Sequence, residues 1–318
     1  MAVAYAALAS LILALALTPL WIRLAPRVGA VDRPRGRHKH RHPTPTSGGL
    51  AIFVAVWAAV LAVEGWPVPD VVIGLFIASG LLVLLNVYDD IHGLPPLGRL
   101  TAQVMLAIVA YAWGVRIEGI GNLGGLLGSE SWVELGALSG PITVFWIVLI
   151  TNGLNWLDGL DGLAAGVAGI SALTLTIMST FSPMFAVVPV IGITSAALVG
   201  ACLGFLRYNF APARVFMGDT GAMFLGFMLA CLSVVGAYKS PTAVAVFLPI
   251  LVLGVPLFDS TSAILKRILS GKNPLVGDRT HIHHRLIDRG LTVRQAVLVI
   301  YGFAGILCLA ALWIWWKQ

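Results

Sequence analysis

Four clusters of acidic, amide and imidazole side chains interrupt a chain that is otherwise mostly apolar. They lie in NVYDDIHGLPPLGRLTAQ (86–103), TNGLNWLDGLDGLAAG (151–166), YNFAPARVFMGDTGAMFLGF (208–227) and the segment 256–290, which contains DRTHIHHRL. Carboxylate oxygens are the ligands that Mg²⁺ prefers, and basic side chains bind phosphate groups. The combination predicts phosphoryl transfer, in which a divalent cation and cationic side chains neutralise charge on the transferring phosphate.

The first cluster ends an apolar stretch with two adjacent carboxylates, Asp89 and Asp90. Neighbouring residues on a helix project about 100° apart, so both cannot face one ligand and we expect each to have its own task. The alternative is that they only solvate a helix end. Acids at a helix C-terminus oppose the macrodipole, however, and acids at membrane depth are costly, so a functional role is favoured.

The second cluster contains two aspartates three residues apart, Asp158 and Asp161, which would share one face if this stretch is helical. Asn152 and Asn155 precede them. Capping of the following helix would explain one of these four side chains. All four together suit a site with several hydrogen bonds to satisfy, such as a nucleotide or metal site.

The third cluster places Asp219 between glycines, where the next apolar segment begins. An ordinary helix N-cap is the alternative for an aspartate in this position. Because the other polar clusters are expected at the same face of the membrane, a ligand to a hard cation is favoured.

The fourth cluster holds three of the seven histidines, His281, His283 and His284. Zinc sites usually pair histidines with cysteines, but all three cysteines lie within apolar stretches. With neighbouring basic residues, Arg279 among them, the histidines form a cationic cluster of adjustable charge that suits a phosphate group. A solvated surface loop is the alternative.

The elements that position these clusters are predicted to be membrane-spanning helices. The chain is 58% apolar and 11% charged, with a mean hydropathy of +0.93, which is outside the range of soluble domains. Segments of about 20 apolar residues, the length that crosses a bilayer, occur near 2–25, 48–66, 70–88, 100–116, 141–156, 163–181, 184–206, 220–238, 241–258 and 295–315. We therefore expect an all-α polytopic membrane protein with about ten transmembrane helices, folded as a single domain over residues 1–318.

Ten spans place both termini on the same side of the membrane. All but three of the 20 Lys and Arg residues then lie on the opposite face, the exceptions being Arg116, Lys239 and Lys317. The positive-inside rule puts that basic face in the cytosol and both termini outside. The rule does not sort acids or histidines, yet every histidine and most acids share the basic face, which indicates a catalytic site facing the cytosol.

In order and spacing, the motifs DD-x8-R-x3-Q, N-x2-N-x2-DG-x-DG, NFAPARVFMGDTG and D-x2-H-x-HHRL resemble those of the polyprenyl-phosphate N-acetylhexosamine-1-phosphate transferases. The resemblance covers the chain from Asp32 to Gly290. It implies that a phosphate oxygen of undecaprenyl phosphate attacks the β-phosphorus of a UDP-sugar, releasing UMP and leaving a lipid-linked sugar diphosphate in the plasma membrane. It also implies a requirement for Mg²⁺, which Mn²⁺ could replace.

The resemblance further implies roles for individual residues. Asp219 would bind the magnesium ion and Asp90 would assist at the metal, while Asp89 would act as a base or orient the lipid phosphate. Arg99 stands where the family usually has Lys, which keeps the charge but changes the donor geometry toward a phosphate. The other implied substrate contacts are Asn155 and Asp158 for the nucleotide-sugar, Asn209, Phe216 and Asp161 for the uracil pocket, and Arg279, His281, His283 and His284 for the diphosphate or sugar.

DRTHIHHRL is most similar to the branch that uses UDP-GlcNAc and starts cell-envelope polymers such as O-antigen or teichoic acid. The expected partners are the UDP-sugar, the polyprenyl phosphate and membrane lipid, with no nucleic acid, and a homodimer is allowed. In the alternative UDP-MurNAc-pentapeptide branch, three consecutive histidines are typical. A CDP-alcohol phosphotransferase would have an Arg soon after DG, where Ala164 and Ala165 stand, and a transporter would place ionisable residues at mid-membrane depth.

Overall fold

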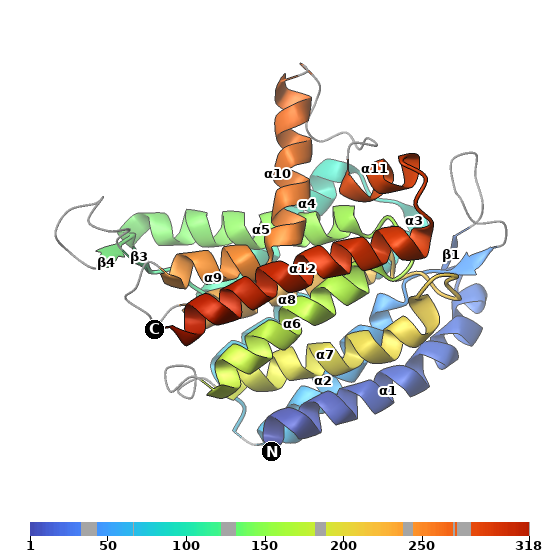
Figure 1. Cartoon of the computed structure of the whole chain (residues 1–318). Coiled ribbons are helices and arrows are strands. Elements are labelled where there is room, and N and C mark those ends of the chain that lie inside the picture. The colour runs from blue at the N-terminus through green and yellow to red at the C-terminus, as the bar shows by residue number, and fades with distance from the viewer. Residues whose placement is uncertain are drawn as a thin grey trace.

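The computed structural model describes residues 1–32, 43–65, 67–121, 132–181, 189–237, 244–269, 271 and 281–317, and within these ranges the chain is almost entirely helical (Figure 1). The helices are α1 (Ala2–Leu24), α2 (Gly49–Glu64), α3 (Asp70–His92), α4 (Pro96–Ala112), α5 (Ser139–Leu157), α6 (Leu163–Phe181), α7 (Pro189–Asn209), α8 (Gly218–Ala237), α9 (Val244–Val252), α10 (Gly254–Leu269), α11 (Ile282–Asp288) and α12 (Val293–Trp316). Two short antiparallel pairs join β1 (Val31–Asp32) to β2 (Thr44–Pro45) and β3 (Gly119–Gly121) to β4 (Trp132–Glu134).

Seven helices in the described part of the chain are long and apolar enough to cross a membrane, namely α1, α3, α5, α6, α7, α8 and α12. Helices α2 and α4 are apolar but shorter, with 16 and 17 residues. These nine helices coincide with nine of the ten predicted segments. The prediction of a predominantly helical protein with several membrane-spanning segments is therefore confirmed.

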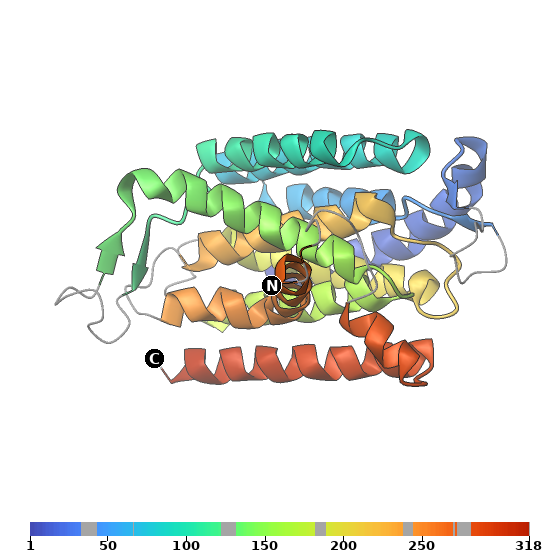
Figure 2. The same cartoon turned by 90° about the horizontal axis from the view of Figure 1, so that it is seen from above.

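The single helix predicted over 241–258 is wrong. Helix α9 ends at Val252, and the chain turns at Leu253 before α10 begins at Gly254. Proline lacks an N–H and crowds the preceding turn, so Pro249 in α9 and Pro256 in α10 disfavour one continuous helix here. As a result, α10 stands out from the bundle in Figure 1, and Figure 2 shows it nearly end-on.

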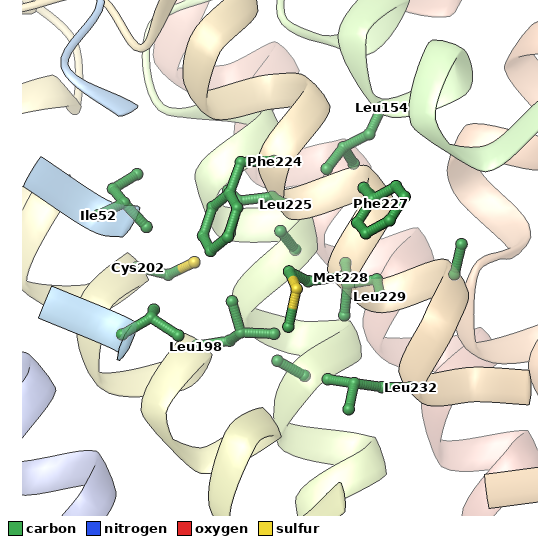
Figure 3. Close-up of a cluster of buried hydrophobic side chains, with 14 of the residues drawn as sticks. Ile52, Leu154, Leu198, Cys202, Phe224, Leu225, Phe227, Met228, Leu229 and Leu232 are labelled. Atoms are coloured by element: carbon green, nitrogen blue, oxygen red, sulfur yellow. The ribbon is translucent and has the colours of Figure 1, made fainter. Parts of the chain in front are cut away.

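Helix α8 forms the centre of the bundle, where it contacts α2, α3, α5, α6, α7 and α9. Figure 3 shows side chains of α8 (Phe224, Leu225, Phe227, Met228, Leu229 and Leu232) together with side chains of α2 (Ile52), α5 (Leu154) and α7 (Leu198 and Cys202). Helix α2 approaches α8 closely because a Cβ on Gly49 would overlap the backbone of Gly221. Small residues at helix contacts are typical of membrane bundles, since apolar side chains gain little by leaving lipid.

The helix connections bring the four predicted clusters to one end of the bundle. Both termini lie toward the end that carries β3 and β4, whereas α11 and β1 lie toward the opposite end (Figures 1 and 2). Helices α3, α5 and α7 finish at this second end, and α4, α6 and α8 start there. The polar motifs therefore lie in connections and helix ends that are close in space.

Candidate active site

The first and third motifs meet through Arg99, in the first turn of α4. Its Nη1 donates to Asp219 Oδ2 at 2.6 Å and to Asp89 Oδ2 at 3.1 Å. Asp89 is 8% exposed, and its other carboxylate oxygen accepts the N–H of Leu94 at 2.5 Å. One guanidinium group thus lies between carboxylates of α3 and α8, which reduces the repulsion between them.

Asp90 has different partners from Asp89. Its Oδ2 accepts the hydroxyl groups of Ser47 at 2.7 Å and Thr220 at 2.8 Å, and its Oδ1 accepts the N–H of Asp219 at 3.1 Å. The first N–H groups of a helix lack acceptors within that helix, so Asp90 of α3 caps the start of α8. The two adjacent aspartates therefore contact different groups, as expected for neighbouring residues that project about 100° apart on a helix.

Asp158 and Asp161 do not lie in a helix, so the shared face expected for a helical stretch does not form. Helix α5 ends at Leu157 and α6 begins at Leu163, so both aspartates lie in the turn between them. Asp158 is the C-cap of α5, and Gly162 adopts a φ of +82°, a conformation that favours glycine. The turn directs the two carboxylates to different partners.

Asn155 and Asp158 lie beside the Asp219 carboxylate. Asn155, in the last turn of α5, hydrogen-bonds to Asp219. Asp158 retains some exposure, but desolvation by the surrounding protein, together with the charges of Asp219, Asp90 and Asp161, raises the pKa of its carboxyl to about 8. Desolvation together with like charge is the pattern found where carboxylates converge on a functional site.

Asp161 and Asn209 join the α5–α6 turn to the segment that precedes α8. The N–H of Ala213 donates to Asp161 Oδ2 at 2.9 Å. The Asn209 amide accepts the N–H of Gly162 at 3.1 Å and donates to the carbonyl of Val215 at 2.9 Å. The buried Asn209 side chain therefore sets the distance between the two segments.

Phe216, at the end of the same segment, pairs with the strand β2 region through its backbone. Its N–H donates to the carbonyl of Pro45 at 2.8 Å, and its carbonyl accepts the N–H of Gly48 at 3.0 Å. Asn209 and Phe216 thus flank the segment between α7 and α8, to which Asp161 of the α5–α6 turn is hydrogen-bonded.

The histidine cluster is held by α10, through a residue that was not among the predicted site residues. His281 Nδ1 donates to Asp259 Oδ2 at 2.8 Å, and the N–H of Ile282 donates to Asp259 Oδ1 at 2.8 Å. Asp259 is 2% exposed and His281 is 6% exposed. Burial alone would raise the pKa of Asp259, but the hydrogen bonds from His281 and Ile282 and the nearby imidazoles bring that pKa below its usual value.

His283 and His284 extend the cluster toward the α5–α6 turn. A Cβ on Gly159 would overlap the His283 imidazole, so the absence of a side chain at Gly159 lets His283 pack against the turn. The rings of His283 and His284 have centroids 4.2 Å apart. On the other side, the His281 ring lies 6.1 Å from the Trp156 ring, over which Arg267 is placed.

A continuous series of contacts therefore joins all four motifs at one end of the bundle. It runs from Asp89 and Asp90 through Asp219 to the α5–α6 turn, and from that turn to the histidine cluster. Of the predicted site residues, Arg279 lies outside the residues that the structure describes.

The sequence analysis missed three residues of this site, Ser47, Thr220 and Asp259. Thr220 is part of the FMGDTG motif and could have been found by asking what caps α8. Asp259 is an acid in an otherwise apolar stretch, which is a signal for a buried partner. Ser47 gives no such signal, because a serine in a proline-rich loop is typical of turns.

The donor set fits a hard cation. The Asp219 and Asp90 side chains lie close together, and the Asn155 side chain hydrogen-bonds to Asp219; the described residues contain no group of three His, Cys, Asp or Glu side chains arranged to hold a metal. Mg²⁺ is usually bound by one or two carboxylates plus substrate phosphates and waters. Asp219, with Asp90 beside it, matches the one or two carboxylates of such a site.

Comparison with known proteins gives a consistent result. Residues 72–237 match the model of glycosyl transferase family 4. A probable undecaprenyl-phosphate N-acetylglucosaminyl 1-phosphate transferase of Bacillus subtilis is 38% identical over 95% of this chain and 82% of its own length.

Two more distant relatives carry related names. A decaprenyl-phosphate N-acetylglucosaminephosphotransferase of Mycolicibacterium smegmatis is 36% identical over 92% of this chain and 77% of its own length. An undecaprenyl-phosphate alpha-N-acetylglucosaminyl 1-phosphate transferase of Escherichia coli is 27% identical over 90% of this chain and 76% of its own length.

Proposed function

Because this chain belongs to glycosyl transferase family 4, we propose that it transfers N-acetylglucosamine 1-phosphate from UDP-GlcNAc to a polyprenyl phosphate and releases UMP. The product is a lipid-linked sugar diphosphate. The observation that carries the proposal is the contact of Arg99 with both Asp89 and Asp219, beside the Asp90 cap of α8. The Arg99 guanidinium lies near the N-terminus of α8, where it can bind a phosphate group and neutralise part of its charge.

Each side chain has a defined task in this reaction. Asp89 orients the phosphate of the lipid, while Arg99 draws negative charge away from the reacting centre. Asp219, with Asp90 beside it, would hold Mg²⁺, which when bound neutralises the diphosphate of the nucleotide-sugar. Asn155 and Asp158 lie beside Asp219 and therefore position the sugar-phosphate half of the donor.

The uracil pocket is proposed around the segment that precedes α8. Asp161 and Asn209 hold this segment against the α5–α6 turn, and the Phe216 ring would stack on the base. His281, His283 and His284 would contact the diphosphate or the sugar from α11. Their attachment to α10 through Asp259 gives them a fixed position over the turn.

The site end of the bundle is proposed to face the cytosol, where UDP-sugars occur, and both termini to face outside. The basic residues of the chain support this orientation, because cytosolic loops are enriched in Lys and Arg. With α2 and α4 counted as spans, and with α9 and the start of α10 together as a broken tenth one, the chain is proposed to cross the membrane ten times as a single transferase domain. The lipid acceptor can then reach Asp89 from the bilayer.

Parallel transfer assays test the function. Membranes containing the chain are offered radiolabelled UDP-GlcNAc, UDP-GalNAc and UDP-MurNAc-pentapeptide side by side with undecaprenyl phosphate and Mg²⁺. We expect label in the lipid fraction from UDP-GlcNAc together with release of UMP. Label from UDP-MurNAc-pentapeptide alone would replace the sugar assignment by the peptidoglycan branch, and no label from any donor would overturn the transferase assignment.

A further inference from the structure

Ser47 has an unusual backbone conformation in a fully buried position. Its φ is +57°, and among the residues that the structure describes it is the one non-glycine residue with a positive φ. Its side chain has 0% exposure. Non-glycine residues in the left-handed region are strained, and such strain tends to persist where the surroundings require one particular geometry.

The surroundings of Ser47 define that geometry. The next two residues, Gly48 and Gly49, donate their N–H groups to the carbonyls of Phe216 and Met217, at 3.0 Å each. These two acceptors lie immediately before α8. The segment 45–49 is therefore fixed along the entry to α8 on both sides of Ser47, because Pro45 accepts the Phe216 N–H as well.

The left-handed turn at Ser47 directs its hydroxyl toward α3. Ser47 Oγ donates to Asp90 Oδ2 at 2.7 Å, and the two residues are 43 positions apart in the chain. The other donors to Asp90, the Thr220 hydroxyl and the Asp219 N–H, both belong to α8. Ser47 is thus the donor that ties the α8 cap to the segment before α2.

The position of Asp219 depends on this arrangement. Asp219 is linked through its backbone to Asp90 and through its carboxylate to Arg99. A Cβ on Gly218 would also overlap the space filled by Asp90 and the Ser47 backbone, so the entry to α8 has little room to shift. Movement of the Asp90 carboxylate would therefore move the start of α8 and, with it, the Asp219 carboxylate.

We propose that Ser47 is a positioning residue for phosphoryl transfer: its hydroxyl holds Asp90 as the external cap of α8 and so places the Asp219 carboxylate toward the diphosphate of the donor. The inference rests on the proposed function. It predicts that the hydroxyl matters for the chemical step more than for donor binding, because Asp219 acts on the reacting phosphate.

Two substitutions distinguish the effect of the Ser47 hydroxyl from the effect of the strained backbone. Ser47→Ala removes the hydroxyl and keeps a side chain at φ +57°, whereas Ser47→Gly removes the hydroxyl and relieves the strain. Ser10→Ala is the matched control, because Ser10 is also fully buried but its hydroxyl donates to the Ala7 carbonyl within α1. Each variant is purified in nanodiscs and compared in melting temperature, kcat and the KM for UDP-GlcNAc.

We expect kcat to fall about ten- to hundredfold in both Ser47 variants, since a hydrogen bond to a charged group is lost. The KM for UDP-GlcNAc should stay within about twofold of the wild-type value, because the contacts that bind the donor in its ground state do not change. Ser47→Gly should melt at a higher temperature than Ser47→Ala, so activity and stability will not change in parallel. Ser10→Ala should keep wild-type kcat.

The inference is overturned if Ser47→Gly keeps wild-type kcat, if kcat follows melting temperature across the variants, or if the loss appears in KM alone. An active wild-type chain with unaffected Ser47 variants would overturn the inference and leave the proposed function intact. A wild-type chain that transfers no sugar phosphate would instead overturn the proposed function itself.

Discussion

Arg99 Nη1 lies 2.6 Å from Asp219 Oδ2, and this contact joins the start of α4 to the start of α8. The same nitrogen lies 3.1 Å from Asp89 Oδ2. The Arg99 side chain is 30% exposed, so the ion pair faces the surface from which a substrate can approach. Partly exposed ion pairs add little to folding stability, so the role proposed for this one is to set geometry and charge at the candidate site.

Two substitutions of Arg99 should show how much of its effect on kcat comes from its charge and how much from the planar geometry of its donors. In Arg99→Lys the charge is kept but one ammonium group cannot reproduce the planar donor geometry of a guanidinium, so we expect kcat to fall about tenfold or less. In Arg99→Met both are lost, and we expect a fall of at least about a hundredfold. The measurement is UMP release in nanodiscs. Equal activity in the two variants would show that the charge of Arg99 has no role.

Removal of the Asp219 carboxylate should abolish transfer without unfolding the protein. Asp219→Ala keeps the backbone N–H that Asp90 accepts, so the cap of α8 is preserved. We expect no detectable Mg²⁺-dependent lipid-linked GlcNAc diphosphate, while the melting temperature stays within a few degrees of the wild type. Retained transfer would remove Asp219 from the proposed metal site.

The sequence was sufficient to predict the membrane helices and the meeting of the motifs. Long apolar stretches have no other stable arrangement than helices in a bilayer, so nine of the segments agree with the structure. Their alternation across the membrane places Asp89, Asp158, Asp219 and His281 at one end of the bundle. That result follows from topology and does not require knowledge of side-chain contacts.

The contacts between the motifs could not be predicted in the same way. The hydrogen bond from Ser47 to Asp90 depends on a left-handed φ within a proline-rich loop, for which a serine gives no pattern. The bond between Asp259 and His281 depends on the break at Leu253, which turns α10 out of the bundle. The sequence did not reveal this break, because apolar residues continue on both sides of Pro249.

The Asp259–His281 pair should make stability depend on acid pH. The pKa of Asp259 is lowered in the folded protein because the hydrogen bonds from His281 and Ile282 outweigh the effect of burial. A carboxyl with a lowered folded pKa stabilises the protein above its unfolded pKa, 3.8 here, and that stabilisation is lost as the pH falls through the folded pKa.

Thermal unfolding between pH 3 and pH 7 tests this linkage. Asp259→Asn should be less stable at pH 7, by about 1.5–3 kcal/mol, the worth of hydrogen bonds to a charged group. It should also lose less stability than the wild type as the pH falls below 3.8, through the range in which Asp259 titrates. If the stability of the wild type and that of the variant decrease in parallel down to pH 3, the role given to Asp259 is contradicted.

Gln103 and Asn152 form a pair one helical turn deeper in the bundle than Arg99 and Asn155. The Asn152 amide donates to Gln103 Oε1 at 2.5 Å and so joins α4 to α5, while the Gln103 amide nitrogen lies 3.4 Å from Met223 Sδ of α8. Gln103 is 4% exposed. The pair therefore fixes the separation of the three helices directly beneath the candidate site.

Single and double substitutions of this pair should have different effects on stability. Gln103→Leu leaves the Asn152 amide with only the Val148 carbonyl as an acceptor, so we expect the free energy of unfolding to fall by about 0.5–2 kcal/mol. Gln103→Leu with Asn152→Leu removes both polar groups and should recover part of that loss, because no amide is left without its partner. Denaturation in detergent measures both variants. Additive losses in the double variant would show that the two amides stabilise the bundle independently and not through their mutual hydrogen bond.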